Sequence, residues 1–142
     1  MQQVYFEDVS EGARLPTLVK TPTTQQLVMF ACATYDYYEL HYDRQFALES
    51  GIDDVIVHGP LKNSFLTQLV TDWMGEAGTL KRLSVRYRGM DTPGSPVYAE
   101  GTVTRKYVDA GESLVECDLR LVNADGQTTT PGNAVVALPS RG

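Results

Sequence analysis

The stretch HGPLKNSFLTQLVTDWMG, residues 58–75, decides the fold. Proline is favoured at the first helical position because its missing N–H would be unpaired there, and Pro60 fits that place. Gly75 can end the helix. Between these two residues, side chains recur at intervals of three and four, as in a helix with one buried face: Leu61, Ser64, Phe65, Gln68, Leu69, Asp72 and Trp73. This is the most hydrophobic helical pattern in the chain, and it predicts the core helix.

Downstream of Gly78 the hydrophobic period changes from helical spacing to two. Apolar and polar residues alternate in 83–87, 97–104 and 115–122, and Ala134–Leu138 is expected to be a last strand. Such alternation is typical of a sheet with one buried face. Residues 91–94 (DTPG) and 123–126 (NADG) are turn signals, because Asp-Gly tolerates positive φ. We therefore predict a single α+β domain over residues 1–142, an antiparallel meander wrapped against the helix.

Upstream of the core helix, residues 1–22 are an irregular lead-in with a short strand expected at Arg14–Lys20. Thr23 or Thr24 can cap a helix that ends near Tyr35. Residues 36–43 (DYYELHYD) form a turn rich in polar and aromatic groups. One or two helical turns are expected at Gln45–Ser50, closed by Gly51.

Composition narrows the class of protein. The chain is 42% hydrophobic and 21% charged, which is ordinary for a soluble globular protein. No apolar run approaches the ~20 residues of a membrane span. The N-terminus lacks the features of a signal peptide, so a cytoplasmic location is expected. The net charge of −6, without a block of lysines or arginines, argues against nucleic acid as the main partner. Cys32 and Cys117 are expected to be two buried thiols in a reducing compartment.

Both histidines of the chain fall in or near the polar segment before the core helix. Asp36 and His41 lie five residues apart. A carboxylate and an imidazole can divide acid–base work, one taking a proton and the other giving one. Acyl-group chemistry also needs hydrogen-bond donors where negative charge develops on an oxygen. The amide of Gly59 stands at a helix N-terminus, where N–H groups are free.

Each of these residues also has a structural explanation. Asp36 can terminate or cap a helix, and His41 can be a surface histidine of the loop. His58 can fix the turn before the core helix. Ser64 and Thr67 can bond to the backbone one turn back, and the tyrosines can serve packing. An Asp and a His five residues apart occur often by chance, so the spacing alone does not decide.

The segment Thr23–Thr67 resembles the MaoC-like hydratases, the (R)-specific enoyl-CoA hydratase group. In that family a helix delivers Asp, then four residues, then His followed by x-Asp, and an Ile-x-His-Gly element leads into the central helix. The matching residues are Asp36, His41, Asp43 and 56–59 (IVHG). Residues 6–12 (FEDVSEG) and 98–103 (YAEGTV) look typical as well. The resemblance thus spans nearly the whole chain.

The resemblance implies a hotdog fold, a long central helix wrapped by an antiparallel sheet, and a dyad of Asp36 and His41. By analogy, Asp36 activates water and His41 protonates the α-carbon. The Gly59 amide would hold the thioester carbonyl, with His58 beside it. Thr67 would support the aspartate, with Ser64 as the alternative. Members normally pair through their sheets, with the active sites at or near the subunit interface.

One departure concerns the residues between the dyad members. The family commonly has Asn-Pro where this chain has Tyr38-Glu39. This resembles a subset of actinobacterial acyl dehydratases that includes small subunits of heteromeric hydratases acting on steroid-derived thioesters, and it makes Tyr38 a candidate substrate contact. No metal or redox cofactor is implied, since coenzyme A or acyl carrier protein is part of the substrate. A homodimer or higher homo-oligomer is expected, or a heteromer with another MaoC-type chain.

The expected activity is (R)-specific hydration of a 2-enoyl thioester or dehydration of a 3-hydroxyacyl thioester. Two alternatives stay open. A hotdog thioesterase often uses one carboxylate on the central helix, and here that helix has none before Asp72. The chain can also be a non-catalytic partner subunit. Arg82, Arg86 and Arg88 are candidates for contacts with coenzyme A phosphates, or are simply solvated strand residues.

Overall fold

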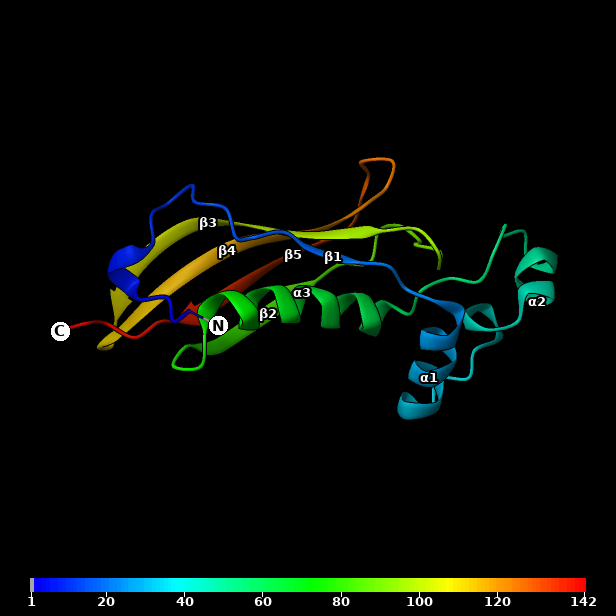
Figure 1. The fold of residues 1–142 in the computed structure, drawn as a ribbon, viewed down its shortest axis with the longest axis horizontal. Coiled ribbons are helices and arrows are strands. Elements are labelled where there is room, and N and C mark those ends of the chain that lie inside the picture. Colours follow the sequence, from blue (N-terminus) through cyan, green and yellow to red (C-terminus); the bar gives the residue numbers. More distant parts are fainter. Residues whose placement is uncertain (1) are drawn as a thin grey trace.

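A curved sheet of five antiparallel strands arches over one long helix in the computed structural model, which describes residues 2–142 (Figure 1). The strands are β1 (Leu18–Lys20), β2 (Thr79–Val85), β3 (Val97–Asp109), β4 (Glu112–Asn123) and β5 (Thr128–Ala137). Their order across the sheet is β1-β3-β4-β5-β2. The helix α3 (Gly59–Met74) lies along the concave side. This arrangement confirms the predicted hotdog architecture.

The core lies between α3 and the inner face of the sheet. The helix turns six side chains inward at a three- and four-residue spacing: Leu61, Lys62, Phe65, Leu66, Leu69 and Val70. Leu61, Phe65 and Leu69 belong to the predicted face, but Ser64, Gln68 and Asp72 of that face are not buried. The buried face is therefore rotated relative to the prediction, and it takes in Lys62, Leu66 and Val70 instead. Alternate residues of β3 and β4 meet this buried face, including Val97, Val103, Val115 and Leu121. Since each such apolar side chain contributes about 1.5–3 kcal/mol on burial, this face fixes how α3 lies on the sheet.

The start and end of α3 follow local signals. Pro60 occupies the first turn, and Gly75 follows the last residue with φ 76°. His58 precedes the helix as its N-cap, but its side chain caps no backbone N–H. The first amides of α3 are therefore available to a ligand. No helix within residues 2–142 combines the length and the apolar character needed to cross a bilayer.

A helical lobe stands beyond the N-terminal end of α3 (Figure 1). It contains α1 (Thr24–Thr34), the 3-10 helix η2 (Glu39–His41) and α2 (Arg44–Glu49), while a second 3-10 turn, η1 (Phe6–Asp8), lies in the lead-in. The Thr23 hydroxyl accepts a hydrogen bond from the Gln26 amide, which confirms the predicted cap. The lobe holds Asp36 and His41.

Four sequence predictions about the strands need correction. The strand expected at Arg14–Lys20 is only Leu18–Lys20, and Arg14 contributes an isolated bridge to Thr102. β3, β4 and β5 form the expected meander, but β2 pairs with β5 at the far edge instead of continuing into β3. β2 ends at Val85, short of Tyr87. β5 begins at Thr128, six residues before the predicted start, and runs through Pro131. The proline is tolerated because its carbonyl accepts from Arg86, so its nitrogen faces away from β4 and no β4 hydrogen bond is lost.

The prediction of two buried thiols is wrong for one cysteine. Cys117 is buried in β4, but Cys32 is exposed on α1. The lobe has no sheet beside it to cover that face of α1, and Met29 of the same helix is 63% exposed. Leu27 and Ala31 form the covered face of α1, and Cys32 does not lie on it.

Candidate active site

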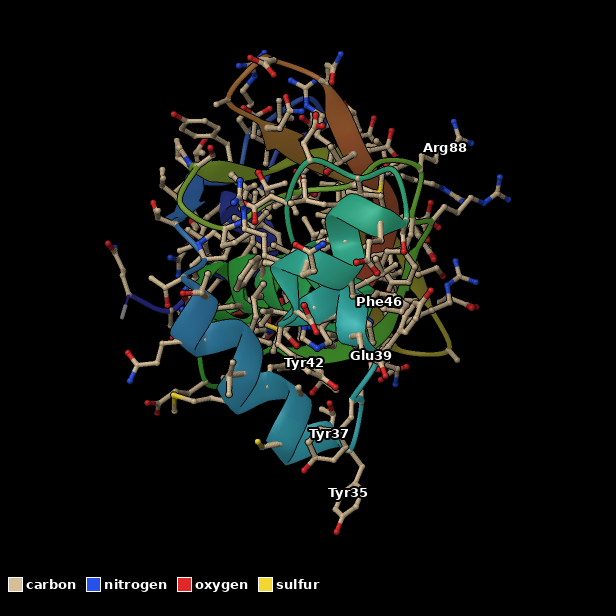
Figure 2. All side chains as sticks on the ribbon, turned by 90° about the vertical axis from the view of Figure 1, so that its right-hand side faces the viewer. Tyr35, Tyr37, Glu39, Tyr42, Phe46 and Arg88 are labelled. Atoms are coloured by element: carbon tan, nitrogen blue, oxygen red, sulfur yellow. The ribbon has the colours of Figure 1, made fainter. Side chains whose placement is uncertain are left out.

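Asp36 is aimed by the turn that ends α1. Tyr35 takes a left-handed conformation with φ 59°, which costs a side-chain-bearing residue roughly 1–2 kcal/mol. The amides of Tyr35 and Asp36 both donate to the Ala31 carbonyl, so the chain reverses sharply there. Figure 2 shows the Tyr35 side chain extending outward from this turn. The reversal directs the next residue, Asp36, toward His41.

His41 lies on η2 and is 8% exposed. Its Nδ1 lies 2.8 Å from the Ile56 carbonyl oxygen. Because a carbonyl only accepts, Nδ1 carries the proton, and Nε2 presents a lone pair when the ring is neutral. Nε2 is 3.7 Å from Asp36 Oδ2. That separation exceeds a direct hydrogen bond, and it lets one small molecule touch both atoms.

His58 is fully buried and stacks on His41, with ring centroids 3.7 Å apart and an interplanar angle of 19°. The edge of its ring meets Phe30. Neither ring nitrogen has a hydrogen-bond partner among the described residues. Burial, followed by the nearby His41, lowers the pKa of His58 below its ordinary value of 6.5, against a smaller opposite effect of Asp36. His58 is therefore neutral and holds the plane of the His41 ring.

Asp36, His41 and His58 are also the residues to examine as metal ligands, because one donor atom of each lies within 4.8 Å of the others. A zinc ion bonds to an imidazole nitrogen at about 2.0–2.1 Å and close to the ring plane. Two nearly parallel rings at 3.7 Å have planes that do not meet within bonding distance. The two histidines thus do not fit one ion in this arrangement, and we assign no metal to them.

A cavity of about 380 Å³ joins His41 to the beginning of α3. Gly59 and Lys62 of the helix line it on one side, and Tyr87, Arg88 and Met90 of the segment after β2 on the other. A β-carbon on Gly59 would lie 3.0 Å from the Tyr87 ring, so only glycine fits without displacing that ring. The cavity therefore brings one member of the proposed dyad next to a free helix N-terminus.

The remaining candidates, Tyr38, Ser64 and Thr67, do not line this cavity. The Tyr38 ring meets His41 edge-on at 6.1 Å and is 52% exposed. The hydroxyls of Ser64 and Thr67 donate to the Pro60 and Asn63 carbonyls one turn back. No hydrogen bond joins either hydroxyl to Asp36 within residues 2–142, so the expectation that this helix supports the aspartate is not met inside the chain.

The sequence prediction missed Lys62 and Asp91. These two residues form a buried ion pair with a Nζ–Oδ2 distance of 3.0 Å beside the cavity. Asp91 was interpreted only as a turn residue. Lys62 precedes Phe65 and Leu66 by three and four residues, so the helical period alone would have placed this lysine on the buried face.

The model of the family described as "MaoC like domain" matches residues 8–123. The chain belongs to this family. One relative, from Mycobacterium tuberculosis, is 33% identical over 93 residues, which are 66% of this chain and 67% of that protein. It is described as 3-oxo-4,17-pregnadiene-20-carboxyl-CoA hydratase beta subunit.

Solved structures of MaoC-like chains share the hotdog fold with this protein. A chain of the ChsH1-ChsH2 complex from Mycobacterium tuberculosis is 26% identical with a TM-score of 0.79, covering 91% of this chain and 98% of that one. The (R)-hydratase from A. caviae, involved in PHA biosynthesis, is 25% identical with a TM-score of 0.82, covering 94% and 99%.

Proposed function

We propose that this protein catalyses the (R)-specific hydration of a trans-2-enoyl thioester, or the reverse dehydration of a 3-hydroxyacyl thioester. The observation that carries the proposal is the 3.7 Å separation of Asp36 Oδ2 and His41 Nε2 beside the start of α3. The hydratase relatives from Mycobacterium tuberculosis and A. caviae support the reaction class.

The proposed mechanism begins with one water molecule between the dyad members. An ionised Asp36 and a neutral His41 Nε2 both accept hydrogen bonds, so the water donates to both and turns a lone pair toward the β-carbon. One proton leaves the water as the C–O bond forms, and one proton reaches the α-carbon. The dyad therefore ends with the proton count with which it began.

The thioester oxygen gains negative charge while the enolate forms. In the proposed complex the Gly59 N–H donates to that oxygen, supported by the positive end of the α3 dipole. The absence of a side-chain cap on α3 leaves this amide free. Tyr87 stands across the cavity, and burial raises the pKa of its hydroxyl above 10.0, so it remains protonated at neutral pH. These steps use only groups of this chain and no metal or redox cofactor.

We further propose that the acyl carrier is coenzyme A. Arg88 lines the cavity, and Arg86 and Arg88 both line an adjoining hollow of about 350 Å³. Neither arginine forms an ion pair with a carboxylate of residues 2–142, whereas Lys81, Arg105 and Arg120 do. In a chain of net charge −6, an unpaired arginine in the cavity wall and a second one in the adjoining hollow suit the phosphates of coenzyme A.

Assembly with a second hotdog chain is part of the proposal. Several large apolar or aromatic side chains of the lobe are 42–86% exposed: Val28, Met29, Tyr35, Tyr37, Tyr38, Tyr42 and Leu48. A second copy of this chain, or another MaoC-type chain, would cover them and close this side of the substrate site. The relative described as a beta subunit and the ChsH1-ChsH2 complex favour assembly with another MaoC-type chain. Native mass spectrometry of the purified protein, alone and copurified from its source, distinguishes the two.

The reaction is tested by following enoyl absorbance with short-chain, long-chain and steroid-derived 2-enoyl-CoA esters. We expect hydration of at least one of them, with the (R)-3-hydroxyacyl product. A thiol reagent in a parallel assay measures thioester cleavage. Release of free thiol without formation of a 3-hydroxyacyl product contradicts the proposal and identifies a thioesterase instead.

A further inference from the structure

Lys62 and Asp91 form an ion pair in which both residues are buried, with 2% and 4% of their surfaces exposed. Removing two charges from water costs free energy that their attraction does not fully regain, so an apolar pair of similar volume is often as stable. Stability alone therefore gives little reason for this pair. Its location indicates another role.

The pair ties the first turn of α3 to the opposite wall of the cavity. Lys62 lies three residues after Gly59, and its ammonium donates to the Gly89 carbonyl at 2.7 Å and to Asp91 at 3.0 Å. The Thr129 hydroxyl of β5 donates to the same Asp91 oxygen at 2.6 Å. The Asp91 carbonyl accepts from Val57, just before α3. The end of the segment that follows Tyr87 is thus attached to α3, to β5 and to the residues just before α3.

The same segment is also fixed from the sheet side. The amides of Arg88 and Gly89 both donate to the Thr129 carbonyl, at 2.9 and 3.0 Å. A β-carbon on Gly89 would lie 3.1 Å from the Thr129 side chain, and one on Gly59 would lie 3.0 Å from the Tyr87 ring. The wall therefore has little freedom to move toward or away from α3 while the ion pair is intact.

The charge of Lys62 explains why it needs Asp91. A cation in the first turn of a helix is opposed by the helix dipole, which favours anions there. The Asp91 carboxylate, 3.0 Å from Nζ, offsets this charge and holds Lys62 in place.

We propose that Lys62 and Asp91 are positioning residues, which hold the Tyr87–Met90 wall at the distance from Gly59 that a thioester carbonyl requires. This inference rests on the proposed hydratase function. Neither side chain contacts the reacting atoms, and both act through the cavity wall.

The decisive variant is the double substitution Lys62→Met and Asp91→Leu, which replaces the ion pair by an apolar pair. The matched control is Lys81→Met with Glu112→Leu, which removes an exposed ion pair of 2.8 Å on β2 and β4. Circular dichroism reports folding, the enoyl absorbance assay gives kcat and KM, and calorimetry gives the Kd of hexanoyl-coenzyme A, which cannot react. Hydrogen exchange measures how fast the Arg88 and Gly89 amides exchange with solvent.

We expect the Lys62/Asp91 double variant to fold, with kcat at least 10-fold lower, faster exchange of the two amides, and weaker hexanoyl-coenzyme A binding. The control variant should keep the wild-type folding, kcat, amide exchange and hexanoyl-coenzyme A binding. A folded double variant with kcat within two-fold of the wild type overturns the proposal. One that fails to fold overturns it too, because the pair would then be needed for the fold itself.

If the wild-type protein hydrates no enoyl thioester, the proposed function is wrong, but the positioning role can still be measured. Hexanoyl-coenzyme A binding then decides it. Weaker binding in the Lys62/Asp91 variant, with normal binding in the control, supports the positioning role. Equal binding in both variants, or no binding by the wild type, overturns it.

Discussion

We expect mild acid to destabilise this protein through His58. Its imidazole is fully buried, and burial lowers its pKa below the ordinary value of 6.5. In the unfolded chain the same ring is solvated and takes up a proton near pH 6.5. Because the unfolded state then binds more protons than the folded state, the free energy of unfolding falls as the pH falls below 6.5. The loss continues down to the lowered pKa of the folded state.

The size of this effect follows from proton linkage. If His58 stays neutral in the fold, lowering the pH from 7.5 to 5.5 reduces the free energy of unfolding by up to about 1.4 kcal/mol. For a domain of 142 residues this corresponds to a fall in Tm of roughly 4–5 °C. Glu7 and Asp8, whose pKa values are lowered mainly by hydrogen bonds from Ser140 and Arg141, act below their ordinary values of 4.5 and 3.8, outside this window.

The assay is urea unfolding at pH 7.5, 6.5 and 5.5 at one protein concentration, followed by the fluorescence of Trp73, the only tryptophan. His58→Gln is the control, because glutamine does not titrate, and its stability should be nearly flat over this range. Wild-type stability that is unchanged between pH 7.5 and 5.5 refutes the reasoning. So does an equal loss in the His58→Gln variant.

Three further substitution and labelling experiments test the cavity and the core. Gly59→Ala places a methyl group 3.0 Å from the Tyr87 ring, so we expect kcat/KM for an enoyl-CoA to fall about 10- to 100-fold, and near wild-type kinetics contradict a tight cavity. Arg88→Ala should raise KM for a coenzyme A thioester about two- to five-fold. It should leave KM unchanged for the N-acetylcysteamine thioester, which has no phosphates. Equal effects on both substrates argue against phosphate binding. At pH 8 a thiol reagent should modify only Cys32 in the native chain, because burial raises the pKa of Cys117 to about 12. Rapid labelling of both thiols would show that β4 is less well packed than described.

Elements with local start and stop signals were predictable from the sequence. Pro60 and Gly75 bound α3, Thr23 caps α1, and Asp125-Gly126 lies in the turn between β4 and β5. Each of these signals acts on residues within one turn of itself. The boundaries therefore did not depend on the rest of the fold.

The pairing of strands was not predictable in the same way. A period of two identifies which face of a strand is buried, but it carries no information about the neighbouring strand. β2 lies beside β5, about 50 residues further along the chain, and β3 starts a separate meander. The start of β5 was missed because Pro131-Gly132 normally interrupts a strand, and only the position of Arg86 explains why it does not here.

The candidate site, too, was only partly predictable from local sequence patterns. Asp36 and His41 were selected through a family resemblance, since their spacing occurs by chance. The stacking of His41 on His58 and the contact of Lys62 with Asp91 join residues 17 and 29 positions apart. Such contacts depend on how the lobe and the segment after β2 meet the start of α3, which no local pattern encodes.

The most direct test of the account is the rate of enoyl-CoA hydration by Asp36→Asn and His41→Ala, measured with the wild type on the best substrate of the panel. Each substitution should lower kcat by at least about 100-fold. Because the two groups act on one water, the double variant should be little slower than either single variant. Near wild-type rates in both single variants would contradict the proposal that Asp36 and His41 carry the reaction.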